Sequence, residues 1–254
     1  EIFTGGLLAP LGFRDGVITI VLGHLIGGII MLLAGYIGAH SKLPAIMSTR
    51  ISFGVYGSYL FAILNILQLI GWTAVMIISG GRAANELSLA LFSFDSINTW
   101  ALVITVLIAL WIALGKDGFG KLNVIAVMLL LGLTLILCGV VFKEGTIFSH
   151  LNSGEMSFGG ALELSIIMPL SWLPLVSDYT RFAQNKKAGL AGTFVGYFIG
   201  SSLMYIIGLA IALYAKDASV GTMMLALNLG LAALGIVLLS TVTTTFLDAY
   251  SAGV

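Results

Sequence analysis

Charged side chains are scarce in this sequence. Lys, Arg, Asp and Glu make up 9% of its 254 residues, whereas a soluble domain carries about 25%. So few charges cannot coat a surface that faces water. The 11 basic and 11 acidic residues also cancel to a formal net charge of zero, which provides no basic surface for nucleic acid. We therefore expect a membrane protein without a nucleic-acid partner.

Cysteine is nearly absent, and the common catalytic motifs are missing. Cys138 is the one cysteine, so the chain can form neither an internal disulfide nor a metal site built on cysteines. No glycine-rich phosphate loop, HExxH or GxSxG pattern occurs. His24 alone does not supply a nucleophile and a base. We expect no enzyme and no bound cofactor, with Na⁺ left open as a coupling ion.

Long apolar runs dominate what is present. Hydrophobic residues make up 59% of the chain, and the mean hydropathy is +1.11. The runs reach about 20 residues, the length at which a helix crosses about 30 Å of hydrocarbon. We expect an all-α, multi-pass membrane protein with one transport domain over residues 1–254. The expected spans are residues 1–13 (partial), 16–38, 58–79, 98–115, 122–142, 159–177, 189–214 and 231–253.

The loops indicate an orientation, because cytoplasmic loops are enriched in Lys and Arg. One side collects Lys42, Arg50, Lys116, Lys121, Arg181, Lys186 and Lys187, and the other Arg14, Arg82, Lys143 and Lys216. The richer side and the amino terminus are therefore expected in the cytoplasm, in a bacterial-type plasma membrane. Because the first run is short and the chain begins at Glu1 without methionine, we also expect a fragment of a longer protein.

Three polar side chains share a face in the run 58–79. Asn65, Gln68 and Trp72 are offset by three and seven residues, which places them together on a helix. An amide one turn from a flat aromatic suits a planar heterocycle, since the indole can stack while the amide reads the edge. The alternative is hydrogen bonding between helices beside a packed tryptophan.

A second polar group lies in the run 231–253. Ser240, Thr244 and Asp248 recur every four residues, with Thr241 and Thr245 beside them. Each hydroxyl alone could bond its own helix backbone. Together their oxygens suit a small hard cation such as Na⁺. Because an ionisable group inside a span often serves function, Asp248 is a candidate to bind substrate or carry a proton, and a helix end near water is the alternative.

The segment IIMPLSWLPLVSDYTRF, residues 166–182, contains Pro169 and Pro174 with Trp172 between them. Each proline removes a backbone donor and clashes with the preceding turn. Irregular backbone at membrane depth is tolerated where it lines a cavity, and transporters use such discontinuous helices to bind substrates. The segment predicts a broken helix at a binding site, with a simple kink as the alternative, and its tail DYTRF is expected to enter the cytoplasm.

Two further residues in apolar surroundings are candidates. His24 lies between Gly23 and Gly27, a spacing that favours close contact between helices. We interpret His24 as a buried, hydrogen-bonded histidine in preference to a proton relay. Glu1 would lie deep in a span if the chain is a fragment, which makes it a candidate for substrate binding.

Four motifs in this order resemble the nucleobase–cation symporter family 1, and most closely its members thought to carry hydroxymethylpyrimidine, a thiamine precursor. They are RISFGVYGS at 50–58, GW at 71–72, SDYTRFAQN at 177–185 and TTTFLDAYSAG at 243–253. The resemblance spans the whole chain. It implies a leucine-transporter-like fold of five-plus-five inverted repeats, covered here from part of helix 1 to helix 8.

The resemblance also implies a function and a site. The function is symport of a small planar pyrimidine, hydroxymethylpyrimidine being favoured over cytosine, purines or allantoin, with Na⁺ or H⁺. A channel is the alternative from another class. Family substrates lie between aromatics of helices 3 and 6, and Trp72 matches the first. Pro169 occupies the position of the second, while Trp172 lies three residues later, so Pro169, Ser171 and Trp172 are all candidates.

The cation ligands implied by the resemblance lie in helix 8. They correspond to the carbonyl of Ser240 and the hydroxyls of Thr243 and Thr244. Asp248 stands where cytosine-type members carry an asparagine, which favours a substrate other than cytosine. A carboxylate suits an aminopyrimidine, because it accepts a hydrogen bond from the amino group and, if protonated, donates to a ring nitrogen.

Overall fold

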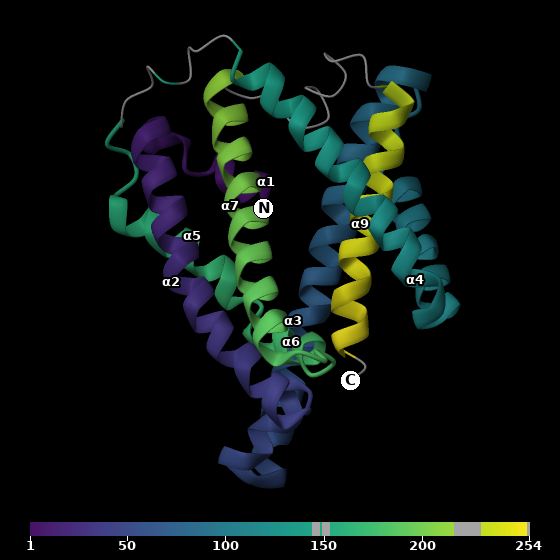
Figure 1. The fold of residues 1–254 in the computed structure, drawn as a ribbon. Coiled ribbons are helices and arrows are strands. Elements are labelled where there is room, and N and C mark those ends of the chain that lie inside the picture. Colours follow the sequence, from purple (N-terminus) through teal and green to yellow (C-terminus); the bar gives the residue numbers. More distant parts are fainter. Residues whose placement is uncertain (144–147, 149–152, 216–229, 253–254) are drawn as a thin grey trace. The chain divides into compact units, whose positions relative to one another are not determined.

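The computed structural model describes residues 1–143, 148, 153–215 and 230–252, and this part of the chain is helical without strands (Figure 1). The elements are α1 (Ile2–Gly6), the 3₁₀ helix η1 (Ala9–Leu11), α2 (Gly12–Ser41), α3 (Ala45–Phe92), α4 (Ile97–Val141), α5 (Phe158–Leu170), α6 (Leu173–Thr180), α7 (Lys186–Ala215) and α9 (Gly230–Ala252).

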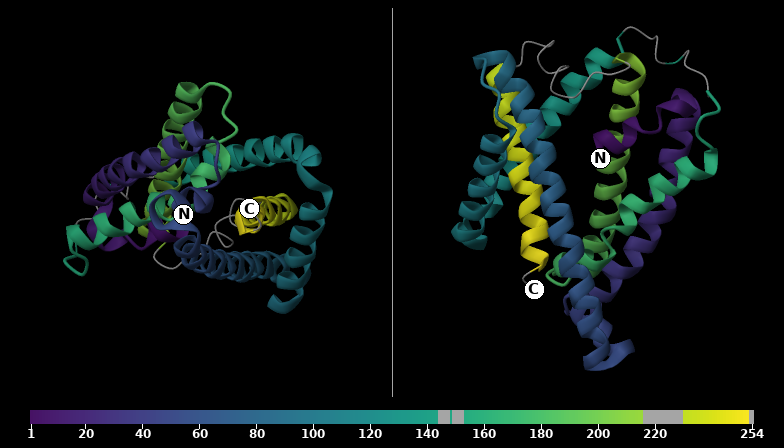
Figure 2. Two further views of the ribbon diagram at one scale, coloured as in Figure 1. Left: turned by 90° about the horizontal axis from the view of Figure 1, so that it is seen from below. Right: turned by 180° about the vertical axis from the view of Figure 1, so that it is seen from behind.

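Several helical segments are apolar enough to lie in a membrane. Those long enough to cross it are Thr4–Ser41, Ala45–Phe92, Phe158–Thr180 and Lys186–Leu213, and the shorter apolar helices are Ile97–Ala113, Val127–Ile136 and Val237–Ala249. Helix α4 runs through both expected spans 98–115 and 122–142, and it bends partway along its length (Figures 1 and 2). The chain is a multi-pass membrane protein.

The chain divides into two compact units. Unit 1 comprises Glu1–Ile63 and Leu137–Lys216, and unit 2 comprises Leu64–Ile136 and Asp217–Val254. In unit 1, α2 packs against α5, α6 and α7, while α1 packs against α7. In unit 2, α3, α4 and α9 share an apolar core of Ile77, Ile104, Leu107, Ile108, Trp111, Leu238 and Val242, and α9 lies beside α3 in Figures 1 and 2.

The motif RISFGVYGS lies near the start of α3 and interrupts it. Gly54 has φ 68° and ψ −178°, which is not helical, and a side chain at such a positive φ would be strained. At Gly57 an added Cβ would lie 2.7 Å from the Cβ of Phe53, so the Phe53 side chain occupies the space that the missing side chain leaves. These two glycines explain the motif as a joint between a short helix and the long apolar part of α3.

Candidate functional site

The helix break predicted from the two prolines is present in unit 1. Helix α5 ends at Leu170 and α6 begins at Leu173, with Pro169 inside the first and Pro174 in the first turn of the second. Because proline has no N–H, Pro169 and Pro174 cannot donate the helical bonds to the carbonyls of Ser165 and Leu170. The break therefore removes two backbone donors within one short segment.

A tight turn around Trp172 joins the two halves. The Trp172 N–H bonds the Pro169 carbonyl at 3.2 Å, and the Ser171 hydroxyl donates to the Met168 carbonyl at 2.7 Å. The Trp172 carbonyl then accepts from Val176 at 2.8 Å as α6 begins. Ser171 and Trp172 are half-buried and Pro169 is buried. The three candidates of this segment thus lie together at the break.

Glycines of α2 let it approach both halves of the broken helix. A Cβ on Gly23 would collide with Ser165, and one on Gly27 would lie 2.7 Å from the Ile166 carbonyl oxygen of α5. A Cβ on Gly38 would lie 2.6 Å from the Cα of Ser177 in α6. The close contact predicted from Gly23 and Gly27 is confirmed. Gly38 extends this contact from α5 to α6.

The DYTRF tail, whose entry into the cytoplasm stays a prediction, begins with a buried residue. Asp178 is 3% exposed, and its Oδ1 accepts the Ala45 N–H at the start of α3 at 2.9 Å. The hydroxyl of Ser177 donates to the Ala34 carbonyl of α2 at 2.8 Å, and that of Thr180 to the Gly35 carbonyl at 2.8 Å. Ser177, Asp178 and Thr180 are thus buried with their polar groups bonded to the backbones of neighbouring helices, whereas Phe182 at the end of the segment is exposed.

A buried polar cluster in unit 1 surrounds His24. The ring is fully buried, with Nδ1 2.9 Å from the Ile20 carbonyl and Nε2 2.9 Å from the Ser201 hydroxyl of α7. The Tyr205 ring packs edge-on against it, with centroids 4.6 Å apart. The predicted buried, hydrogen-bonded histidine is confirmed.

The same face of α7 reaches the helix break. The Tyr197 and Trp172 rings are edge-on with centroids 6.0 Å apart. The Tyr197 hydroxyl is buried without a hydrogen-bond partner in the described part of the chain. The carboxylate of Glu1, an exposed residue, lies near enough to interact electrostatically with Tyr197 and Tyr205. Unit 1 thus brings Tyr197 of α7 beside Trp172 at the break.

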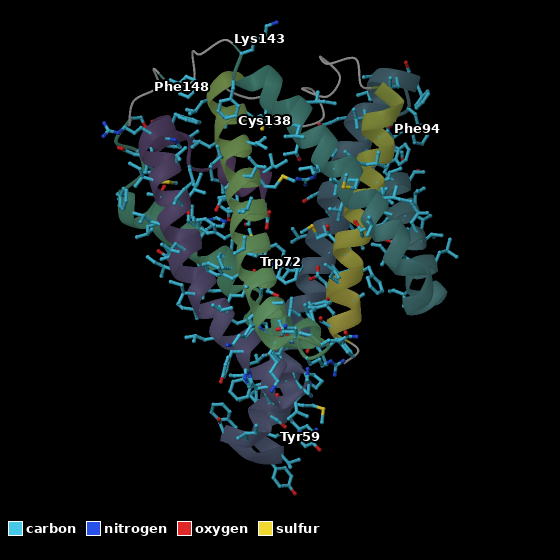
Figure 3. All side chains as sticks on the ribbon, in the orientation of Figure 1. Tyr59, Trp72, Phe94, Cys138, Lys143 and Phe148 are labelled. Carbon is cyan, nitrogen blue, oxygen red and sulfur yellow. The ribbon has the colours of Figure 1, made fainter. Side chains whose placement is uncertain are left out.

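Unit 2 contains the predicted amide and aromatic face of α3. Asn65 is 5% exposed, and its Oδ1 is buried without a hydrogen-bond partner among the described residues. Gln68 and Trp72 are half-buried, and Figure 3 shows Trp72 midway along α3, between Tyr59 near one end and Phe94 beyond the other. A buried amide oxygen without a donor is costly, so Asn65 is suited to accept a bond from a ligand.

Hydroxyls of α9 bond their own helix. The Thr243 hydroxyl lies 2.9 Å from the Leu239 carbonyl and 3.1 Å from that of Ser240. Two predicted cation ligands, the Thr243 hydroxyl and the Ser240 carbonyl, are thus adjacent. The other candidates on this helix, Thr244 and Asp248, are half-buried.

Some members of the unit 1 cluster were missed from the sequence. Tyr197, Ser201 and Tyr205 are spaced by four residues on α7, the same signal that identified Ser240, Thr244 and Asp248. Tyrosine and serine are less conspicuous than a carboxylate in an apolar run, but their repeated spacing could have identified this face.

A family model and several known proteins resemble the chain. The model described as permease for cytosine/purines, uracil, thiamine, allantoin matches residues 2–254. Cytosine permease of Escherichia coli strain K12 is 30% identical over 258 residues, covering 100% of this chain and 60% of the permease. Purine-uracil permease of Arabidopsis thaliana is 25% identical over 245 residues, covering 83% of this chain and 41% of that protein.

One solved structure that the chain resembles is that of Mhp1, a nucleobase-cation-symport-1 family transporter in a closed conformation with bromovinylhydantoin bound. It matches with a TM-score of 0.80 and 16% identity, covering 97% of this chain and 60% of Mhp1. The expected leucine-transporter-like fold is confirmed by this match. The chain spans about 60% of the length of the Escherichia coli permease.

Proposed function

This chain belongs to the family of permeases for cytosine and purines, uracil, thiamine and allantoin, and we propose that it functions in a secondary active transporter importing a small planar pyrimidine. Hydroxymethylpyrimidine is the favoured substrate, coupled to Na⁺ or H⁺. Cytosine, a purine or allantoin is the alternative, supported by the similarity to cytosine permease of Escherichia coli. The proposed location is a bacterial-type plasma membrane with a cytoplasmic amino terminus.

The observation that carries this proposal is the break between α5 and α6. It removes two helical N–H donors beside Trp172, the residue that precedes α6. A break of this kind exposes carbonyl groups and gives a flat ligand access to an aromatic side chain, as in other transporters with discontinuous helices. A channel, by contrast, needs a continuous polar path and has no requirement for a stacking aromatic.

Each candidate has a proposed role toward the pyrimidine. Trp72 and Trp172 stack on the ring, while Asn65, Gln68 and Asp248 hydrogen-bond its edge. Asp248 is the proposed partner of the amino group, which would favour an aminopyrimidine. Lesser contacts are proposed for Pro169, Ser171 and Glu1.

The proposed cation ligands are the Ser240 carbonyl and the hydroxyls of Thr243 and Thr244, all oxygen groups that suit Na⁺. Secondary transporters of this kind work by motion of one bundle against another around a central site.

Uptake by the full-length protein in liposomes tests the proposal. We expect saturable accumulation of labelled hydroxymethylpyrimidine, stronger than that of cytosine, when an inward Na⁺ or proton gradient is imposed. Dissipating each gradient separately identifies the coupling ion. Uptake that equilibrates without accumulation under either gradient would support a channel, and preference for cytosine would support the alternative substrate.

A further inference from the structure

Basic side chains gather at one end of unit 1, where α2 ends and α7 begins (Figure 1). The basic residues of the stretches 36–56 and 173–200 are Lys42, Arg50, Arg181, Lys186 and Lys187. The same stretches contain a single acid, Asp178, which is buried with its carboxylate accepting the Ala45 N–H. These parts of unit 1 therefore carry an excess of positive charge.

Contacts between α2, the turn after α6 and the start of α7 bring three of the cations together. The Lys42 ammonium donates to the Ala183 carbonyl at 2.8 Å. Ala183 lies against the first turn of α7, where a Cβ added at Gly189 would be 2.6 Å from the Ala183 Cβ. Lys186 and Lys187 begin that turn. Because an ammonium has three N–H donors, Lys42 has two more to offer a further acceptor.

An exposed apolar face of α7 begins beside Lys187. Ala191, Val195 and Ile199 follow Lys187 at intervals of four residues, which places them along one side of the helix. All four are exposed, and this part of α7 lies within the apolar segment Lys186–Leu213, which is long enough to cross a membrane. Such a face suits lipid tails, while a lysine at its end reaches the depth of the headgroups.

Aromatic side chains accompany the cations at this end of the unit. Exposed Tyr36 near the end of α2 stacks on His40, with ring centroids 3.8 Å apart. The Arg181 guanidinium lies 4.7 Å from the ring centroid of Phe182, which is exposed. Tyrosine is enriched where a membrane meets water, so Tyr36 supports an interfacial position for this end.

We propose that Lys42, Lys186 and Lys187 bind the headgroup phosphate of an anionic phospholipid, whose acyl chain lies along the exposed face of α7. The phosphate oxygens accept hydrogen bonds from the ammonium groups, and the lipid supplies the negative charge that these segments lack. Phosphatidylcholine carries a cation beside its phosphate, so it gains less from the lysines. The site lies within unit 1 and does not depend on the substrate that is transported.

The test compares two lipids that differ in headgroup charge. Native mass spectrometry of the purified full-length protein in detergent measures the binding of phosphatidylglycerol and of phosphatidylcholine with identical acyl chains. We expect phosphatidylglycerol to bind more tightly. Lys187→Gln should weaken its binding roughly fivefold, the contribution of one basic residue near an anionic headgroup, and leave phosphatidylcholine binding unchanged. Because Lys187 is exposed, the thermal midpoint without added lipid should not change.

A matched control is Lys143→Gln, the same change at an exposed lysine at the opposite end of unit 1 (Figure 3), which should alter neither affinity. Glycerol 3-phosphate, which has a phosphate but no acyl chains, should not displace phosphatidylglycerol at an equal concentration. Equal binding of the two lipids, equal weakening by the two variants, or displacement by glycerol 3-phosphate overturns the lipid site. Each of these results leaves the transporter proposal intact, because uptake of the pyrimidine is measured separately.

Discussion

Helix α6 of unit 1 and helix α9 of unit 2 use their polar side chains differently. In unit 1, hydroxyls and a carboxylate bond the backbones of other helices, as Ser177 and Thr180 bond α2 and Asp178 bonds α3. In unit 2, the α9 hydroxyls of Thr243 and Thr245 bond carbonyls of their own helix. Bonds between helices hold a bundle together where lipid removes the hydrophobic drive for association. Polar substitutions should therefore cost stability in α6 and change binding in α9.

Gly38→Val in unit 1 should have the largest effect. An added Cβ there would lie 2.6 Å from the Cα of Ser177 and 2.6 Å from the hydroxyl of Thr180, and backbone cannot move aside as a flexible side chain can. We expect a loss of about 3 kcal/mol or more in stability, at the upper end of overpacking costs, measured by thermal unfolding in detergent.

The matched control for Gly38 is a glycine with open space around it. Gly192 on α7 would meet nothing within 4 Å of an added Cβ, so Gly192→Ala should be neutral or stabilising, since alanine favours a helix over glycine. Gly38→Ala should still destabilise. Equal stability of Gly38→Ala and Gly192→Ala would contradict close packing between α2 and α6.

Asp178→Ala should be the next largest change. It removes a buried acceptor from the Ala45 N–H, and the loss of a hydrogen bond to a charged group costs about 2 kcal/mol. Thermal unfolding of the full-length protein measures it. Glu163→Ala, at an exposed acid of α5, is the control and should be neutral. A neutral Asp178→Ala variant would mean that unit 1 does not depend on this bond.

Some of these structural features could be predicted from the sequence and others could not. Hydropathy predicts the helical membrane fold because the spans must be apolar throughout, and Pro169 and Pro174 predict the break because proline lacks an N–H. Gly23 and Gly27 predict a close contact through their spacing. The role of Asp178 could not be predicted, because its acceptor bond joins residues 133 positions apart. A motif near a helix end does not indicate which distant backbone group its side chains will bond.

Trp72→Ala in unit 2 and Trp172→Ala in unit 1 test the contribution of each tryptophan to ligand binding. Stacking of a base on an aromatic contributes about 1–3 kcal/mol, so each variant should weaken pyrimidine binding about tenfold. Both tryptophans are half-buried. The thermal midpoints of the two alanine variants should therefore fall less than the thermal midpoint of Gly38→Val. Loss of affinity in Trp72→Ala alone would reject stacking by both residues.

Asp248→Ala should reduce uptake without a matching loss of stability. Its carboxylate is the proposed partner of the amino group, so affinity should fall more for hydroxymethylpyrimidine than for an analogue without that group. Asp248→Asn keeps an acceptor and should retain part of the affinity. Uptake by Asp248→Ala equal to that of the wild-type protein would remove the carboxylate from the site.

Thr243→Ala and Thr245→Ala give the smallest expected effects and the sharpest test of unit 2. Both hydroxyls bond their own helix, Thr243 to Leu239 at 2.9 Å and Thr245 to Thr241 at 2.7 Å, and such bonds contribute little to stability. Only Thr243 is a proposed cation ligand. Thr243→Ala should therefore raise severalfold the Na⁺ concentration for half-maximal uptake, while Thr245→Ala should leave it unchanged. An equal rise in both variants would mean that Thr243 and Thr245 act through the packing of α9. The hydroxyls of α9 would then have a structural role, as those of α6 do.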